Sequence, residues 1–209
     1  MKKDFDLPLV NAHTHAAMIA FRGMAEDLLL KDWLEKYIWP MEKEKVNPKF
    51  VYENTKIAIK EMQRNGIRFF NDMYFFEDEV AKAAEELKMN VVVGEVILDF
   101  PPPSARCPDE TLEITEKLLI KYKNNPYIKV AVAPHSIYAL SEEYLVKAKV
   151  LAKKYDAIYH IHLAETKFEV EECQEKHNLT PVGYIDKLGL LDKKTVLIRA
   201  FFNVQKFRS

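Results

Sequence analysis

Six short apolar runs, separated by helical segments along the whole chain, limit the possible folds of this sequence more than any other feature. Several runs are almost continuously apolar, as in strands buried on both faces of a parallel sheet. Strands that alternate with helices predict βαβ units with right-handed crossovers, and therefore an α/β fold with a parallel sheet. The predicted strands are residues 7–13, 67–74, 90–97, 128–135, 157–164 and 195–201.

The segments between these runs have helical periodicity and recognisable ends. Asn47 followed by Pro48 is typical of an N-cap with proline at the first helical position, and Gly66 marks the end of the same helix. Thr180 and Pro181 repeat the start signal. No Ser/Gly-rich linker or internal repeat divides the chain, which predicts one domain over residues 1–209. Helices are expected at about 30–45, 47–65, 77–88, 109–125, 141–154 and 167–177.

Composition excludes several classes of protein. The 209 residues are 48% hydrophobic and carry 31 Lys and Arg against 32 Asp and Glu, which is typical of a globular protein without the basic surface of a duplex nucleic-acid binder. No apolar run approaches the roughly 18 to 20 residues that span a bilayer. Cys107 and Cys173 have no closely spaced partner, so we expect reduced thiols and a cytoplasmic location.

Histidines and acids gather where the apolar runs end. In a (β/α)8 barrel the carboxyl ends of the strands meet at one mouth, so residues far apart in sequence come together there. Periodicity alone does not distinguish such a barrel from an open, doubly wound sheet. The residues in question are His13, His15, Asp72, His135, His160, His162 and Glu165.

The histidine pair His13 and His15 has the spacing of two metal ligands on one strand. His13 and His15 are two residues apart, which places both side chains on one face of an extended strand. His162 is a candidate third ligand, and Glu165 is a candidate general acid/base next to it. The alternative is that His160 and His162 are hydrogen-bonded fillers of the barrel interior and Glu165 is a solvated loop acid. For His160 we favour this structural interpretation.

Several motifs occur together in a fixed order between about Leu7 and Ile198. In this order the sequence resembles the amidohydrolase superfamily, and within it the branch of 5'-methylthioadenosine/S-adenosylhomocysteine deaminases, with cytosine-deaminase-like and chlorohydrolase relatives. The resemblance implies a TIM barrel. The motifs are VNAHTHAAM at 10–18, FRGMAEDL at 21–28, Trp33-Leu34, NDMY at 71–74, APHS at 133–136 and HLAE at 162–165.

The resemblance also implies roles for individual residues. One divalent metal per site, Zn²⁺ or Fe²⁺, would be bound by His13, His15 and His162. Glu165 would carry a proton from the metal-bound water to a ring nitrogen of the substrate. His135 would line the substrate site, and a histidine at this position supports one metal ion rather than two.

Three further residues are implied in substrate binding. Trp33 and Glu42 match family positions that bind the substrate: Trp33 would pack the base or thioether, and Glu42 would bind ribose hydroxyls. The alternative is that Trp33 is an apolar residue on a helix face and Glu42 is a solvated helix acid. Glu95 stands in the third strand, where some nucleoside-type members have an arginine, and Arg106 in the following loop could replace that arginine as a carboxylate contact.

The sequence departs from the family pattern at both ends. Family members begin with a small β-sandwich, and their sixth strand ends in Ala-His, whereas here Ile198 is followed by Arg199. We therefore expect an incomplete barrel of about six parallel strands, without the sandwich, without strands seven and eight, and without the aspartate that is the fourth metal ligand. The loss of resemblance after Ile198 suggests a truncated reading frame, which resequencing of the locus tests. Open strand edges predict self-association.

The resulting prediction is a metal-dependent aminohydrolase that deaminates a purine nucleoside and is impaired in this chain. Its partner is a small-molecule substrate, with no nucleic acid or membrane, and a homo-oligomer is expected. A second hypothesis is a non-catalytic fragment, or a half-barrel that completes another chain. A third is an unrelated α/β binding protein with structural histidines, which predicts no metal.

Overall fold

The computed structural model describes residues 9–25, 27–28 and 30–200 of the chain. Its strands form one sheet in which every neighbouring pair is parallel. The sheet runs in the order of the sequence, as expected for successive βαβ units. Its strands are β1 (Leu9–Thr14), β2 (Ile67–Asp72), β3 (Asn90–Val93), β5 (Ile128–Pro134), β6 (Ile158–His162) and β7 (Thr195–Ile198), with a short β4 (Val96–Ile97) paired to β5.

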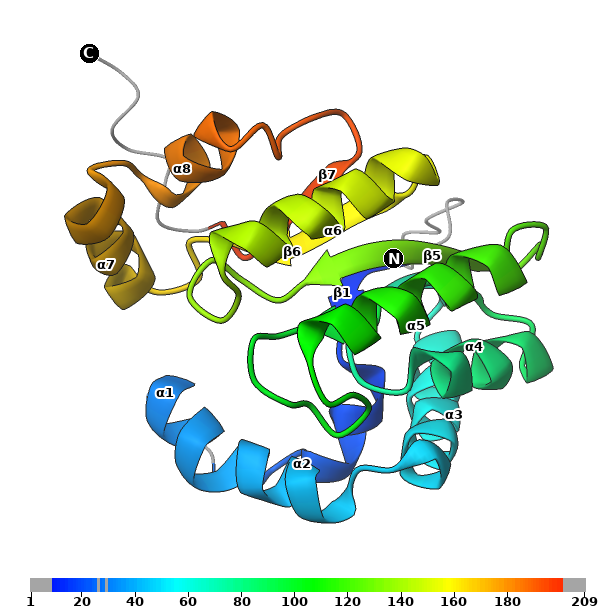
Figure 1. Cartoon of the computed structure of the whole chain (residues 1–209). Coiled ribbons are helices and arrows are strands. Elements are labelled where there is room, and N and C mark those ends of the chain that lie inside the picture. Colours follow the sequence, from blue (N-terminus) through cyan, green and yellow to red (C-terminus); the bar gives the residue numbers. More distant parts are fainter. Residues whose placement is uncertain (1–8, 26, 29, 201–209) are drawn as a thin grey trace, which may run out of the picture.

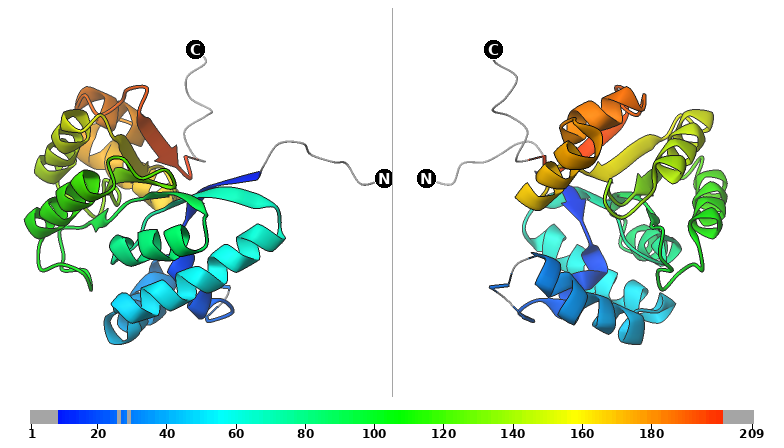
Figure 2. Two further views of the ribbon diagram at one scale, coloured as in Figure 1. Left: turned by 90° about the vertical axis from the view of Figure 1, so that its right-hand side faces the viewer. Right: turned by 60° about the vertical axis from the view of Figure 1, so that its left-hand side comes forward.

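Helices connect the strands and cover the outside of the curved sheet (Figures 1 and 2). Residues 30–45, between β1 and β2, form the expected helix as two α-helical portions joined by a π-helical turn, Leu34–Ile38. The prediction of an α/β fold and an incomplete TIM barrel is confirmed. The α-helices are α1 (Leu30–Trp33), α2 (Trp39–Lys45), α3 (Pro48–Arg64), α4 (Glu77–Glu86), α5 (Pro108–Lys121), α6 (Glu142–Lys154), α7 (Lys167–His177) and α8 (Pro181–Lys187), and a 3-10 helix covers Ala16–Phe21.

Local signals explain where the helices begin and end. The Asn47 side chain accepts a hydrogen bond of 3.0 Å from the Phe50 backbone N–H, which satisfies a free donor at the start of α3. Thr180 caps α8 in the same way through the Gly183 N–H, at 3.1 Å. Gly66 has a φ of +79°, a left-handed conformation that suits glycine just after a helix.

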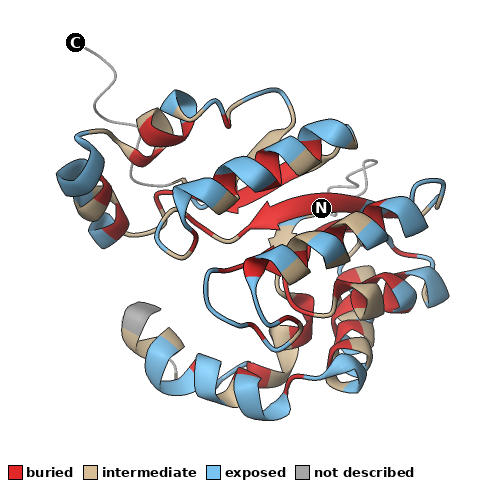
Figure 3. Ribbon diagram, in the orientation of Figure 1, coloured by how far each residue is buried: buried red, intermediate tan, exposed pale blue. Residues whose placement is uncertain are grey.

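The core lies between the sheet and the inner faces of the helices. Figure 3 shows buried residues along β5 and β6 and along one side of each covering helix. In β3, Val91 and Val93 are fully buried, as the continuous apolar pattern predicted. In α3, Val51 and Ile59 face the core while the opposite side of the helix is exposed.

The third predicted strand is interrupted. Residues 90–97 form β3 and β4, with Gly94 and Glu95 between them. A Cβ atom at Gly94 would lie 2.7 Å from the Cβ of Ala133, so only glycine allows this approach to β5. The break turns the buried Glu95 carboxylate toward the start of α4, where it accepts from the backbone N–H of Glu77 at 2.8 Å.

The barrel wall is open between its first and last strands. Among the described residues, β1 pairs only with β2 and β7 only with β6. Leu9 and Val10 on β1 are 49% and 60% exposed. Residues 7–8 and 201, the expected ends of the first and last runs, lie outside the described residues. No described helix is both long and apolar enough to cross a membrane.

Candidate metal centre and active site

A cavity of about 680 Å³ lies at the carboxyl ends of the strands, bordered by the helical segment that follows β1. Strand ends far apart in the sequence contribute to its wall, which is the arrangement that a barrel mouth imposes. The site residues predicted from sequence that line this cavity are His13, His15, Trp33, Glu42, His135, His162 and Glu165.

Three histidines converge in the cavity wall. One nitrogen from each of His13, His15 and His162 lies within 4.8 Å of the other two. The Nε2 atoms of His13 and His162 are 3.0 Å apart. His13 lies on β1, His15 directly follows the end of β1, and His162 ends β6, so the two-residue spacing at this strand end and the curvature of the sheet together create the cluster.

Backbone carbonyls fix the orientation of two of these rings. Nδ1 of His15 donates to the Met73 carbonyl, and Nδ1 of His162 donates to the His135 carbonyl at 3.1 Å. A carbonyl oxygen only accepts, so the proton of each neutral ring is on Nδ1 and the lone pair is on Nε2. Hydrogen bonds of this kind orient metal-ligating histidines in proteins.

Burial keeps the three rings neutral. It lowers the pKa of His15 to about 3 and that of His162 to about 4, and it lowers the pKa of His13 further. Repulsion between the neighbouring rings contributes to these shifts for His13 and His15. Metal ions bind the neutral imidazole, and three imidazoles with room for a water are a typical donor set for catalytic zinc. The residues present therefore fit a zinc ion.

His160 lies behind the cluster rather than in the cavity wall. It is fully buried, with Nε2 at 3.3 Å from Nδ1 of His13 and 3.4 Å from the side-chain nitrogen of Asn71. Asn71 also donates to the Ala12 carbonyl at 3.1 Å. His160 and Asn71 thus support the back of the His13 ring, on the side away from the cavity.

Glu165 follows β6 and borders the cavity with 10% of its side chain exposed. Its backbone N–H donates to the Glu169 carboxylate at 2.9 Å. Its Oε1 accepts from the guanidinium of Arg199, which lies just after β7. Two contacts thereby hold Glu165 in the cavity wall, three residues beyond His162.

The predicted substrate-binding residues border the rest of the cavity. Trp33 donates from its indole nitrogen to the Met24 carbonyl at 3.3 Å. Glu42 is buried, and it accepts a hydrogen bond of 2.7 Å from the Tyr74 hydroxyl. Burial raises the pKa of Glu42 to about 7. The His135 ring is 4.9 Å from that of His162.

The amidohydrolase family model matches residues 8–202. The chain belongs to the amidohydrolase family. It is 46% identical over 183 residues to a 5-methylthioadenosine/S-adenosylhomocysteine deaminase of Thermodesulfovibrio yellowstonii, covering 88% of this chain and 42% of that protein. It is 40% identical over 190 residues to a 5'-deoxyadenosine deaminase of Methanosphaera stadtmanae, covering 90% of this chain and 44% of the relative.

Solved structures agree with this assignment. An adenosine deaminase from Xanthomonas campestris with bound zinc superposes with a TM-score of 0.88 at 36% identity, over 91% of this chain and 43% of that one. A guanine deaminase from C. acetobutylicum with bound guanine shares the fold, with a TM-score of 0.80 at 23% identity and a coverage of 91% and 48%. This amidohydrolase chain spans less than half the length of these relatives.

One predicted site residue lies elsewhere in this amidohydrolase. Arg106 is exposed, and its guanidinium binds Glu110 with an Nε–Oε2 distance of 3.0 Å. It does not border the cavity of the histidine cluster. A loop position after a strand indicates the correct end of the barrel, but it does not determine the direction of a long side chain.

The cavity wall of this amidohydrolase also contains polar residues that the sequence motifs do not single out as site residues, among them Tyr74, Tyr138 and Arg199. Tyr74 ends the predicted strand 67–74 within the NDMY motif, and Tyr138 is three residues beyond His135, so the positions of both relative to strand ends were signals that could have found them. Arg199 had been noted as a departure from the family pattern, and its contact with Glu165 is visible only in the structure.

Proposed function

We propose that this chain carries the metal-binding and acid–base part of an aminohydrolase site that deaminates purine nucleosides such as 5'-methylthioadenosine or S-adenosylhomocysteine. The observation that supports this most is the convergence of three neutral histidines beside Glu165 in one cavity. The names of the relatives support the substrate class, because they are deaminases of 5'-substituted adenosines.

We assign one Zn²⁺ per site to His13, His15 and His162, with Fe²⁺ as the alternative. When bound, such an ion supplies an activated water near neutral pH. The zinc-bound structural relative supports this choice of metal. The three rings contribute neutral donors, so no deprotonation is needed at pH 7 before the ion binds. Backbone carbonyls set the tautomers of His15 and His162.

Glu165 is the proton carrier in this proposal. It takes a proton from the attacking water and delivers it to the ring nitrogen of the substrate, while the hydroxyl group adds to the carbon that bears the amino group. The proton of the new hydroxyl group then passes to the amino group, which leaves as ammonia as the C–N bond breaks and the carbonyl forms. Arg199 engages Oε1 of Glu165, so we assign proton transfer to Oε2. His135 faces the same space from the end of β5 and would position the ring.

The remaining cavity suits a nucleoside. Its volume is within the range of about 300–1,000 Å³ that is typical of small-molecule sites. Trp33, together with the contacting rings of Trp39 and Phe100, offers apolar surface for a base or thioether. The buried Glu42 carboxyl is an acceptor for ribose hydroxyls. Arg106 is not included, because its guanidinium binds Glu110 outside the cavity.

A second candidate function rests on the open barrel wall. The unpaired outer edges of β1 and β7 among the described residues would accept strands from another polypeptide, and the chain would then act as a half-barrel partner or as a homo-oligomer.

Cys107 and Cys173 are both free thiols, which supports a cytoplasmic location for either function.

Ammonia release with zinc present tests the proposal, with 5'-methylthioadenosine, adenosine and cytosine as substrates. The 209 residues span less than half the length of the relatives, and groups that act as one unit lose most of the rate when one is missing, so we expect the 209 residues on their own to be inactive or severely impaired. A longer protein, in which the remaining segments of a relative extend the 209 residues, should deaminate the purine nucleosides, and Glu165→Gln in it should abolish the activity. A longer protein that binds zinc but releases no ammonia would contradict the proposed function.

A further inference from the structure

The end of β2 holds the segment that carries two of the histidines. The Met73 N–H donates to the Thr14 carbonyl at 3.1 Å, and the Met73 carbonyl accepts from Nδ1 of His15. Backbone pairing between β1 and β2 is irregular between Asn11 and Thr14, so the regular ladder does not position this segment by itself. Side-chain contacts therefore have a larger part in fixing it.

Asp72 provides the central contact of this kind. Its side chain is fully buried, and its Oδ1 accepts from the Thr14 hydroxyl and from the Ala16 backbone N–H, the latter at 2.7 Å. Thr14 stands between His13 and His15, and Ala16 follows directly. One carboxylate oxygen thus fixes the chain on both sides of His15.

A second buried acid faces Asp72. Glu77 is fully buried, and its Oε2 accepts from the Gly94 N–H at 3.2 Å. No protein donor in the described part of the chain reaches the other oxygens, Oε1 of Glu77 and Oδ2 of Asp72. The carboxyl groups of Asp72 and Glu77 are close enough to influence each other's ionisation, and two adjacent buried carboxyls do not both ionise. Burial and the charge of Asp72 raise the pKa of Glu77, which favours Glu77 as the protonated member of the pair and leaves its proton available to an oxygen that has no other donor.

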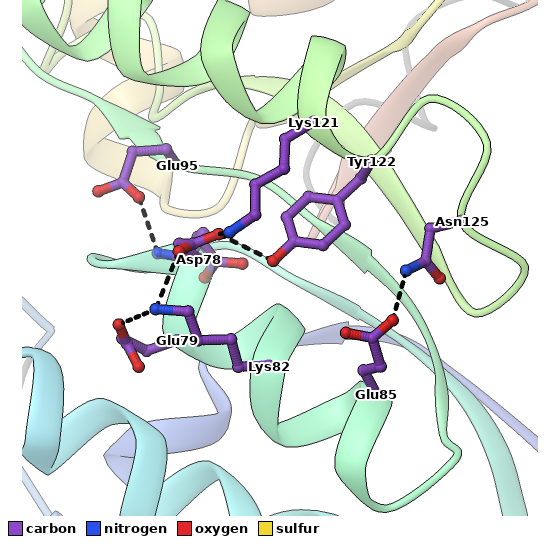
Figure 4. Close-up of polar contacts among 9 residues, drawn as sticks. Asp78, Glu79, Lys82, Glu85, Glu95, Lys121, Tyr122 and Asn125 are labelled. Atoms are coloured by element: carbon purple, nitrogen blue, oxygen red, sulfur yellow. Dashed lines mark hydrogen bonds and ion pairs between the residues drawn. The ribbon is translucent and has the colours of Figure 1, made fainter.

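The helix that carries Glu77 is anchored on two sides. Glu95 accepts from the backbone N–H groups of Phe76 and Glu77, at 3.0 and 2.8 Å, where α4 begins. Figure 4 shows Glu95 directed at this backbone, and it shows Asp78 on the same turn bound by Lys82, Lys121 and Tyr122. Glu77 is therefore presented to Asp72 by a fixed turn of helix.

We propose that Asp72 and Glu77 are a positioning pair for the metal-binding histidines: Glu77 donates its carboxyl proton to Asp72, and Asp72 holds Thr14 and Ala16 so that His13 and His15 keep their orientation. The inference rests on the proposed function, because it takes these two histidines as metal ligands. Neither acid borders the cavity, so the pair acts through the segment 13–16 and not on the substrate.

Matched substitutions in the 209-residue chain test the pair, with zinc affinity measured by competition against a chelating dye. Thr14→Val removes the hydroxyl that binds Asp72, whereas Thr14→Ser keeps it. Loss of an outer contact made directly to a metal ligand typically weakens binding about 10- to 100-fold. The Thr14–Asp72 contact acts on the ligands through the backbone next to them, so we expect the lower end of this range, about 10-fold, for Thr14→Val and less than about 3-fold for Thr14→Ser. Glu77→Gln, whose amide N–H replaces the carboxyl O–H, should bind like the parent, and Glu77→Met should bind more weakly.

Two further readouts separate positioning from general stability. The melting temperatures of the metal-free variants report the fold, and the visible spectrum of each Co²⁺-loaded variant reports ligand geometry. Thr14→Val should change the cobalt spectrum, and Thr14→Ser should not. Equal zinc affinity and equal spectra for Thr14→Val and Thr14→Ser would overturn the inference, and this comparison decides the matter if Glu77→Met does not fold. A parent chain that binds no zinc would instead refute the proposed function.

Discussion

Glu42 lies in the wall of the cavity with 6% of its surface exposed, and it accepts a hydrogen bond of 2.7 Å from the Tyr74 hydroxyl. Burial raises its pKa from 4.5 to about 7, and the hydrogen bond from Tyr74 only partly opposes this. Folding therefore changes the proton affinity of this carboxyl, and the stability of the protein must depend on pH through it.

The sign and size of this dependence follow from the two pKa values. Below pH 4.5 the carboxyl is protonated in both states and has no effect. Between 4.5 and about 7 the unfolded chain releases the proton while the folded chain retains it, so stability falls as pH rises and levels off above 7. At about 1.4 kcal/mol per pH unit the total is about 3 kcal/mol. About 2 to 3 kcal/mol of this develops between pH 5 and pH 8.

Glu42→Gln keeps the acceptor for Tyr74 and removes the titration. Urea unfolding of the metal-free protein at pH 5 and pH 8 measures the difference, and contributions from other groups cancel between variant and parent. We expect Glu42→Gln to gain about 2 to 3 kcal/mol over the parent between these pH values. Glu44→Gln, an exposed position on the same helix, should follow the parent. Parallel pH dependence of Glu42→Gln and the parent would refute the reasoning.

Three other expectations can be measured on the same protein. The folded pKa values of His15 and His162 are about 3 and 4, so the stability of the metal-free protein should be full above pH 6.5 and should fall as the pH drops below it. Urea unfolding of His162→Gln and of the parent at pH 7 and pH 5 measures this fall, which should be smaller in the variant. An equal loss of unfolding free energy in the two proteins would contradict it. Ile161 is fully buried in β6, so Ile161→Ala should cost about 2–5 kcal/mol of unfolding free energy, whereas Val150→Ala, at a site 62% exposed, should change it by less than about 0.5 kcal/mol. The open edge of β1 should promote association, so light scattering should find oligomers that Val10→Lys reduces, and a monodisperse parent monomer would count against this.

Much of the fold could be predicted because strand and helix positions follow local patterns. The apolar runs and the caps at Asn47 and Thr180 located most elements within a few residues. Closure into a barrel was inferred from the family resemblance, since periodicity carries no information on sheet curvature. The break at Gly94 was not predicted, because it depends on the close approach of Ala133 from another strand.

The site was predictable to the extent that strand ends meet in a barrel. The two-residue spacing of His13 and His15 keeps both at the carboxyl end of one strand, with His15 one residue beyond it, and His162 at the end of another run reaches the same mouth. Long or buried charged side chains were harder to place. Arg106 turns toward Glu110, and Glu77 is fully buried beside Asp72, a pairing of two acids that no sequence pattern encodes.

Zinc bound to the 209-residue chain tests the central claim most directly. Metal analysis after purification without chelator, combined with X-ray absorption at the zinc edge, gives both the stoichiometry and the ligand atoms. We predict one zinc ion per chain with Zn–N distances of about 2.0–2.1 Å. The zinc should be lost in His13→Ala, His15→Ala and His162→Ala. It should be retained in His177→Ala, which changes an exposed histidine on α7. A chain without zinc, or zinc retained at full occupancy in the three cavity variants, would contradict it.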